Sequence, residues 1–260
     1  STLHDVLIQM LREYYMVGGM PEAVNVFIET NDANSVREVQ REILLAYKND
    51  ISKHTTKEQS QRIAMVWNSM PSQLSKENKK FIYGVVKKGG RANEFELAIQ
   101  WLIDAGLIIK VGRITTPSMP LKVYEDLSAF KLYLLDVGLL GAMAEINPVQ
   151  LLLPNDMKES KGMFTENFVC TQLVTQFNSS LFYYSKENST LEIDFFVQKE
   201  TQIIPIEVKA ELNVKSKSLS TILQNNEEMF GVRFSMNQYR QQEKIVNLPL
   251  YCAEVYFKED

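Results

Sequence analysis

The chain has 260 residues, enough for one large domain or two to three small ones. Its apolar fraction of 45% and charged fraction of 23% are those of an ordinary globular protein. The net charge of −4 excludes a general basic coat for nucleic acid, but it leaves room for a local basic groove. No apolar run approaches the roughly 20 residues that span a bilayer, so we expect no membrane contact and a cytoplasmic protein.

Residues 1–75 show helical periodicity. Apolar residues recur at helical spacing over 3–15 and stop at Gly18 and Gly19, and a second helix is predicted over 21–30. A third helix is predicted over 35–54, with Asn34 or Ser35 as its cap, and a fourth over 57–70, before Pro71. We therefore expect an N-terminal helical segment. Because the sequence opens without Met in a pattern already helical, we expect it to be a piece of a longer protein.

Residues 76–157 follow a different pattern. A helix is predicted over 92–107 and ends near Gly106, and its buried face comprises Phe95, Ala98, Ile99, Leu102 and Ala105. A strand over 107–112, a proline-containing loop and a helix over 130–144 come next. Helices followed by a strand, a loop and a strand are the outline of a winged helix.

Residues 158–260 mix helices and strands. A helix is predicted over 162–177, followed by strands over 181–186, 191–198 and 202–210. A serine-rich helical stretch precedes two further strands, over 231–236 and 248–257. The whole chain is therefore expected to be an α+β multidomain protein whose C-terminal α/β domain has a mixed sheet.

Two acids and a lysine interrupt the apolar pattern of residues 191–210. Alternate residues of a strand share a face, which puts Asp194 on one face of its strand and Glu207 with Lys209 on one face of the next. If the connecting turn is an even-numbered loop centred between residues 200 and 201, Asp194 lies opposite Glu207, where paired β carbons are about 4.5–5.5 Å apart. Two carboxylates that close need positive compensation.

A divalent cation is one source of that compensation. Mg²⁺ takes one or two carboxylates together with water and phosphate, and Mn²⁺ is an alternative. Lys209 would then orient water or stabilise charge on a phosphate, and Glu166 would join the site if its helix packs across the sheet. The other reading is structural: Glu192 and Lys209 form an ion pair on a solvated face, with Asp194 and Glu207 merely exposed.

Glu166, Asp194 and the run Glu207-Val208-Lys209 resemble the PD-(D/E)XK motif of the restriction-endonuclease-like superfamily. The resemblance implies that Asp194 and Glu207 hold Mg²⁺, with the Val208 carbonyl as a further ligand. It also implies that Lys209 assists hydrolysis of DNA phosphodiesters and that Glu166 is the accessory helix acid. The residue before Asp194 is Ile193, whereas the name of the motif gives proline at that position.

Four further segments resemble the C-terminal region of prokaryotic AAA+-type ATPases, in which a domain of unknown function follows the ATPase core. These segments are EYYMVGGMPEAV, AYKNDISKH, YEDLSAFKLYLLDVGLL and GMFTENFVCTQL. The resemblance implies that a P-loop module, which binds ATP, precedes this chain in the parent protein.

The chain's own glycine-rich run, Gly84 to Arg91, has Gly90 and Arg91 where a P-loop needs Lys and Ser or Thr. We therefore interpret it as a helix end and turn, and expect ATP to bind only to the absent module. In the winged helix, the acidic outer face of residues 92–107 favours a protein-contact or linker role. The alternative is contact with a DNA backbone through the basic residues that flank this helix in sequence and in the wing.

Two functions remain. One is a metal-dependent nuclease acting on DNA, and the other is an inactive nuclease-like module that binds a partner protein or DNA for the ATPase.

Overall fold

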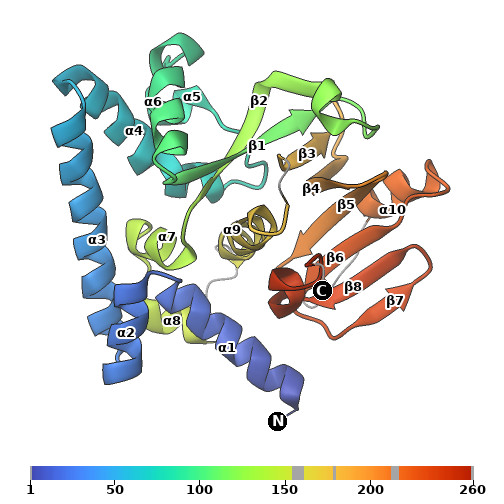
Figure 1. Cartoon of the computed structure of the whole chain (residues 1–260), viewed down its shortest axis with the longest axis horizontal. Helices are drawn as coiled ribbons and strands as arrows, with labels where there is room; N and C mark the ends of the chain where they lie inside the picture. The colour runs from blue at the N-terminus through green and yellow to red at the C-terminus, as the bar shows by residue number, and fades with distance from the viewer. Residues whose placement is uncertain (1, 154–160, 178–179, 212–216, 259–260) are drawn as a thin grey trace. The chain divides into compact units, whose positions relative to one another are not determined.

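The computed structural model describes residues 2–153, 161–177, 180–211 and 217–258. This described part is α+β, with ten α-helices and one mixed sheet of eight strands (Figure 1). The chain divides into two compact units. The sheet unit comprises residues 1–8, 110–131 and 168–260, and the helical unit comprises residues 9–109 and 132–167.

The helical unit holds the helices α2 to α8, the larger part of α1 and the start of α9. Their bounds are α1 Leu3–Val17, α2 Pro21–Thr30, α3 Ala33–His54, α4 Lys57–Leu74, α5 Tyr83–Val86, α6 Ala92–Asp104, α7 Val137–Met143, α8 Pro148–Leu152 and α9 Lys161–Val174. As predicted, α1 ends at Gly18, whose φ of +73° is a conformation that favours glycine. The predicted inner face of α6 is buried at Phe95, Ala98, Ile99 and Leu102, whereas Ala105, which follows the last helical residue, is exposed.

Two helix ends differ from the prediction. The cap of α3 is Asp32, whose carboxylate accepts hydrogen bonds from the backbone N–H groups of Asn34 and Ser35. A carboxylate at this position also suits the positive end of the helix. Helix α4 continues through Pro71 to Leu74. Proline lacks the N–H that would donate a hydrogen bond within the helix. The last turn of α4 is nevertheless hydrogen-bonded, because the Ser75 N–H donates to the Pro71 carbonyl.

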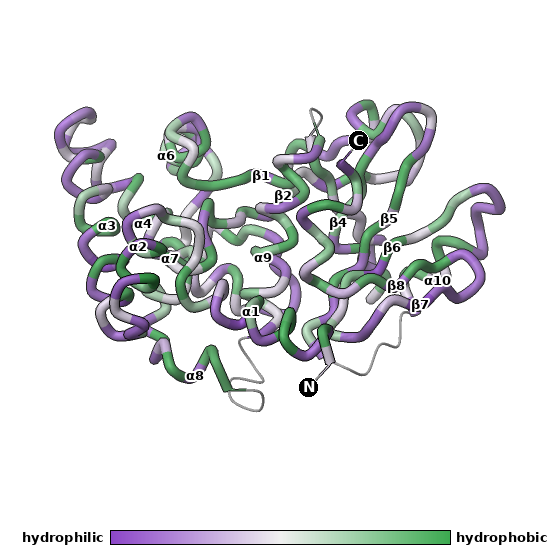
Figure 2. The backbone as a smooth tube through the Cα atoms, turned by 60° about the horizontal axis from the view of Figure 1, so that its bottom comes forward, coloured by the Kyte–Doolittle hydropathy of each residue, from purple (hydrophilic) through white to green (hydrophobic). Residues whose placement is uncertain are grey.

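The sheet has the strand order β2-β1-β3-β4-β5-β6-β8-β7. The strands β3, β4 and β5 pair antiparallel in sequence, and β6 pairs parallel with both β5 and β8. Strand bounds are β1 Ile108–Ile114, β2 Glu125–Leu134, β3 Phe182–Ser185, β4 Glu192–Lys199, β5 Gln202–Lys209, β6 Gly231–Ser235, β7 Arg240–Gln242 and β8 Ile245–Pro249. The mixed sheet therefore agrees with the prediction, and Figure 2 shows how apolar much of β5 is.

A parallel pair needs a crossover connection, and α10, Lys217–Gln224, supplies it between β5 and β6. Its buried Leu219, Ile222 and Leu223 join an apolar cluster with residues of β3 and β4. At Gly231, the first residue of β6, a β carbon would lie 2.8 Å from Leu219 Cδ1. The absence of a side chain there lets α10 pack directly on the sheet.

Two predicted elements were wrong. Residues 130–134, expected in a helix, belong to strand β2, and the helix that follows is the short α7. The buried N-cap Asp136 separates the two, because its side chain accepts a hydrogen bond from Leu139 N. The strand expected over 248–257 ends at Pro249, and a 3₁₀ helix, Leu250–Glu254, follows it. In both segments a nearly continuous apolar run hid the change of conformation.

Among the described residues, no helix combines the length and apolarity needed to cross a membrane. The domain boundaries predicted at 75/76 and 157/158 stay a prediction, and the second lies outside the described residues. The glycine-rich run 84–91 forms the end of α5 and a turn, as interpreted above.

Candidate functional site

The β4–β5 hairpin has the register that the sequence predicted. Lys199 pairs with Gln202 across a two-residue turn, which is centred between residues 200 and 201. The last backbone pair before the site joins Phe195 to Ile206. The next position in this register places Asp194 opposite Glu207, which is the relationship required for a shared carboxylate site.

Asp194 lies in a β-bulge, which the sequence did not predict. A single residue of β3, Tyr183, lies opposite Asp194 and Phe195 of β4. Strict alternation is therefore interrupted, and Ile193 and Phe196 belong to the same apolar cluster although their positions differ by an odd number. A bulge bends its strand and turns individual side chains, and such irregularities are frequent near active sites.

The Asp194 carboxylate is turned toward β5. Its Oδ2 accepts a hydrogen bond of 2.8 Å from the backbone N–H of Val208, which lies between Glu207 and Lys209. A charged acceptor makes this hydrogen bond stronger than an ordinary backbone bond. The side chain of Asp194 thereby fixes the position of the backbone that carries the two other candidate residues.

Glu207 is buried, with 4% of its surface exposed. Its Oε1 lies 3.0 Å from the ammonium of Lys209, and its Oε2 lies 3.7 Å from Nε of Arg233. The second distance is an ion pair but too long for a hydrogen bond. Oε2 accepts no hydrogen bond from the residues that the structure describes. A buried carboxylate oxygen in this state is costly and marks a position where a ligand would be stabilising.

Arg233 stands beside Glu207 in the parallel β5–β6 pair. Burial lowers the pKa of the Arg233 guanidinium below its usual value, and the negative charge of Glu207 opposes that effect. Lys209, by contrast, is partly open, since 34% of its side chain is exposed. Of the two cations at Glu207, Lys209 is therefore the one that can reach a molecule in solvent.

A second ion pair involves Glu192, which is two residues before Asp194 on β4. Lys131 of β2 is 1% exposed, and its ammonium lies 2.6 Å from Oε1 of Glu192. The same ammonium lies 4.9 Å from the centre of the Tyr183 ring, an arrangement typical of a cation–π contact. Burial is the main reason that the pKa of Tyr183 rises to about 12, so this phenol stays neutral at physiological pH.

These six residues form what we call the charged row. It consists of Lys131, Glu192, Asp194, Glu207, Lys209 and Arg233, and has three acids and three basic residues. The reading as a solvated ion pair does not describe it. Glu192 is paired with Lys131, and Glu207 is buried rather than exposed.

Sequence reasoning missed two members of the row. Arg233 is a charged residue within the apolar strand GVRFS, just as Glu207 is a charged residue within the apolar strand β5. This break in the apolar pattern was the sequence signal that could have identified Arg233. Lys131 stands inside an apolar run that was taken for a helix, so its place beside Glu192 was hidden.

Glu166, the predicted accessory acid, belongs to the helical unit. It is buried on α9, where its Oε2 lies 2.6 Å from the ammonium of Lys79 and its Oε1 accepts a hydrogen bond from the Tyr133 hydroxyl. Within this unit Glu166 thus links α9 to Lys79 and Tyr133. Its membership of the metal site stays a prediction.

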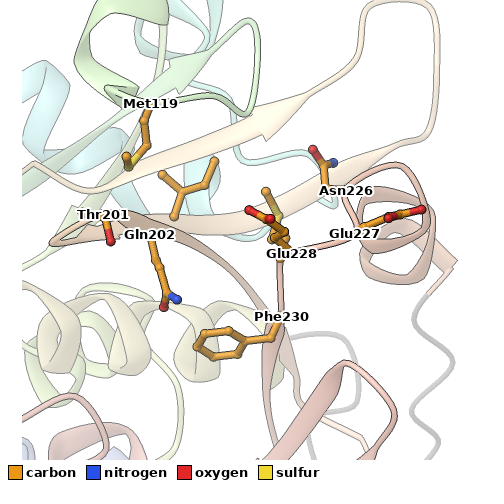
Figure 3. A pocket seen from close by; sticks show the side chains of 9 residues that line it. Met119, Thr201, Gln202, Asn226, Glu227, Glu228 and Phe230 are labelled. Atoms are coloured by element: carbon orange, nitrogen blue, oxygen red, sulfur yellow. The ribbon is translucent and has the colours of Figure 1, made fainter.

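A surface pocket of about 580 Å³ lies elsewhere in the sheet unit (Figure 3). It is lined by Thr201 and Gln202 at the start of β5 and by residues that precede β6, including Glu228 and Phe230. Glu207 is five residues further along β5, about 17 Å at the rise of a strand. The pocket is therefore separate from the charged row.

The charged row offers hard oxygen ligands of the kind that Mg²⁺ prefers. Glu207 Oε2 and the carboxylate of Asp194 fit this requirement, and the carbonyl of Val208 is a further oxygen in the same segment. No group of three or more His, Cys, Asp or Glu side chains within the described ranges is arranged to hold a metal ion. A metal here would complete its shell with water and substrate oxygens.

Comparisons with known proteins identify the chain at the level of families. Neither the curated proteins nor the solved structures gave a match. Residues 161–253, which include the charged row except Lys131, match a domain of unknown function (DUF4143) that is often found after AAA ATPase cores. Residues 8–150 match another domain of unknown function (DUF8612). Since this match covers more than half of the 260 residues, the chain belongs to the DUF8612 family.

Proposed function

We propose that the chain is a metal-dependent phosphodiesterase module that hydrolyses DNA and works in a prokaryotic cytoplasm as part of an AAA+-like ATPase. The observation that carries the proposal is the buried Oε2 of Glu207, which accepts no hydrogen bond from the described residues. Glu207 lies on β5, which pairs with the strand that carries Asp194, and it is two residues before Lys209. An acid pair with an adjacent lysine matches the chemical needs of phosphodiester hydrolysis.

Each residue has a distinct role in this proposal. Asp194 and Glu207 hold the metal, and the Val208 N–H keeps the Asp194 carboxylate in place. Lys209 stabilises the charge that develops on the phosphate, for which its partly exposed ammonium is suited. The bound metal supplies Lewis-acid polarisation of the phosphate and a lowered pKa for water.

The fold supports the proposal in its order of elements. The motif residues lie on α9, β4 and β5, which is the order of helix, strand and strand expected of a restriction-endonuclease-like domain. We also infer a winged helix from α4, α6, β1 and β2, placed before that domain.

The direct test is cleavage of fluorescently labelled single- and double-stranded DNA with Mg²⁺ or Mn²⁺. We expect product with wild type, and a loss of at least about 100-fold with Asp194→Asn, Glu207→Gln or Lys209→Met, since each removes a group used in the transition state. Glu187→Gln is the matched control, because Glu187 is an exposed acid of the sheet unit that pairs with Arg113. Equal activity in all five proteins would refute the proposal.

A second candidate, the partner-binding module, is favoured by the outer face of α6. Leu97 is 80% exposed there and is flanked by the exposed acids Glu96 and Asp104. An exposed leucine among carboxylates suits a basic protein surface and disfavours phosphate. Mn²⁺ binding separates the candidates, because a module that serves only as a scaffold has no need of a metal at Glu207.

A further inference from the structure

We infer that Arg233 acts as a built-in cation at Glu207 and makes metal binding depend on the phosphate of the substrate. The inference rests on the proposed function, because it concerns how the same site is loaded. It assigns a positioning role to Arg233, a residue that supplies neither a metal ligand nor an exposed group.

The charge balance of the row is the first step. The row holds three carboxylates and three cations, and two of these cations, Lys209 and Arg233, form ion pairs with Glu207. A divalent cation bound at Glu207, which is buried together with Arg233, adds an excess positive charge close to Lys209 and Arg233. Repulsion at short range is strong where burial lowers the effective dielectric, so the protein alone should bind the metal weakly.

The substrate supplies the missing negative charge. A phosphodiester oxygen beside the metal offsets the excess charge and gives Lys209 an anionic partner outside the row. Metal and phosphate should therefore strengthen each other's binding, and by linkage the coupling is the same in both directions. A site without Arg233 would lack one positive charge that repels the metal. Its metal affinity would therefore be higher without phosphate and would depend less on phosphate.

Arg233 is suited to this role because of its position. It is 3% exposed and pairs with Glu207 in the β5–β6 register. Solvent therefore screens its charge poorly, and a substrate cannot easily reach it. The carboxylate of Glu207 is therefore held beside a cation even without a metal. Its Oε2 is nevertheless left without a hydrogen bond from the described residues. The arrangement compensates the charge of Glu207 and leaves a ligand position open.

The test measures free Mn²⁺ by electron paramagnetic resonance with the purified chain. Two oligonucleotides of one sequence are compared: phosphorothioate DNA, which is anionic and resists cleavage, and methylphosphonate DNA, which is neutral. Mn²⁺ bound by each oligonucleotide alone is subtracted. For wild type we expect the phosphorothioate to tighten Mn²⁺ binding about tenfold or more and the methylphosphonate to leave it unchanged.

Variants assign the effect to Arg233. Arg233→Met should bind Mn²⁺ about tenfold more tightly than wild type without DNA and should lose most of the phosphorothioate effect, while Arg233→Lys should retain it. Lys209→Met, at a more exposed position, should also bind Mn²⁺ more tightly than wild type without DNA. It replaces Arg233→Met as the test variant if Arg233→Met does not fold. Lys122→Met, which removes an exposed cation of the same unit, should match wild type.

The outcomes separate the inference from the proposed function. Mn²⁺ binding by wild type that is equally tight with and without phosphorothioate would overturn the inference and leave the metal site standing. Unchanged Mn²⁺ affinity in both Arg233→Met and Lys209→Met would also overturn it. If wild type binds no Mn²⁺ under either condition, the proposed function itself fails.

Discussion

The backbone N–H of Val208 donates a hydrogen bond of 2.8 Å to the carboxylate of Asp194, across the two strands that carry the candidate site. This bond joins the bulged strand β4 to the segment that carries Glu207 and Lys209. Asp194 therefore has a structural role in addition to its proposed role as a metal ligand.

The two roles of Asp194 separate by substitution. Asp194→Ala should lower the free energy of unfolding by about 1–3 kcal/mol, because the Val208 N–H loses a charged acceptor. Asp194→Asn keeps an acceptor oxygen and should cost less than Asp194→Ala, while both abolish Mn²⁺ binding. Urea denaturation gives the free energies, and equal stability of Asp194→Ala and wild type would contradict the structural role.

Glu207 and Arg233 should be energetically coupled. Glu207→Gln leaves Arg233 buried beside a neutral amide and should destabilise the fold by about 3 kcal/mol, within the range for breaking a buried ion pair. The double variant Glu207→Gln with Arg233→Met should lose at least about 1 kcal/mol less than the two single losses together. A double-mutant cycle by urea denaturation measures this difference, and strict additivity would show that the pair does not interact.

Glu166 should matter for the stability of the helical unit. Glu166→Gln leaves the buried ammonium of Lys79 without its carboxylate, and we expect a loss of about 3–5 kcal/mol. Lys79→Met combined with Glu166→Gln should restore part of that loss. The thermal midpoint monitored by circular dichroism serves as the readout, and a Glu166→Gln protein as stable as wild type would show that the ion pair contributes nothing.

Asp136 gives a prediction about pH. Burial raises the pKa of Asp136 above its ordinary 3.8, although hydrogen bonds from the Gly19 and Leu139 N–H groups oppose the shift. A raised pKa means that the folded state binds the proton more tightly than the unfolded state does. The stability from this group is therefore complete below the unfolded pKa and is lost as pH rises through the folded pKa.

The Asp136→Asn variant isolates this effect, because asparagine does not titrate. The free energy of unfolding of wild type minus that of Asp136→Asn should fall as pH rises from about 3 to about 6. Both proteins are compared by urea denaturation across this interval. A difference that rises with pH would mean that the pKa is lowered instead.

The hairpin that carries the site could be predicted from sequence because its information is local. Turn residues at 200 and 201 fix the register, which pairs the two strands as far as Phe195 and Ile206, one position before Asp194 and Glu207. The bulge at Asp194 could not be predicted, since it depends on how β3 packs beside β4. Periodicity within one strand carries no information about its neighbour.

Arg233 shows the same limit at longer range. It is 26 positions after Glu207, and only the parallel crossover through α10 brings the two together. The helix predicted over 130–144, which was wrong for residues 130–134, likewise concealed Lys131. Both cations were therefore missing from the predicted site, although each forms an ion pair with an acid of the charged row.

The most direct test of the central claim is a Mn²⁺ titration of wild type and Glu207→Gln in the presence of phosphorothioate DNA, followed by electron paramagnetic resonance. We predict saturable binding of Mn²⁺ to wild type beyond that of the oligonucleotide alone, and its loss in Glu207→Gln. Glu187→Gln should bind as wild type does. Saturable binding that is unchanged in folded Glu207→Gln, or none in wild type, would contradict a metal site at Glu207.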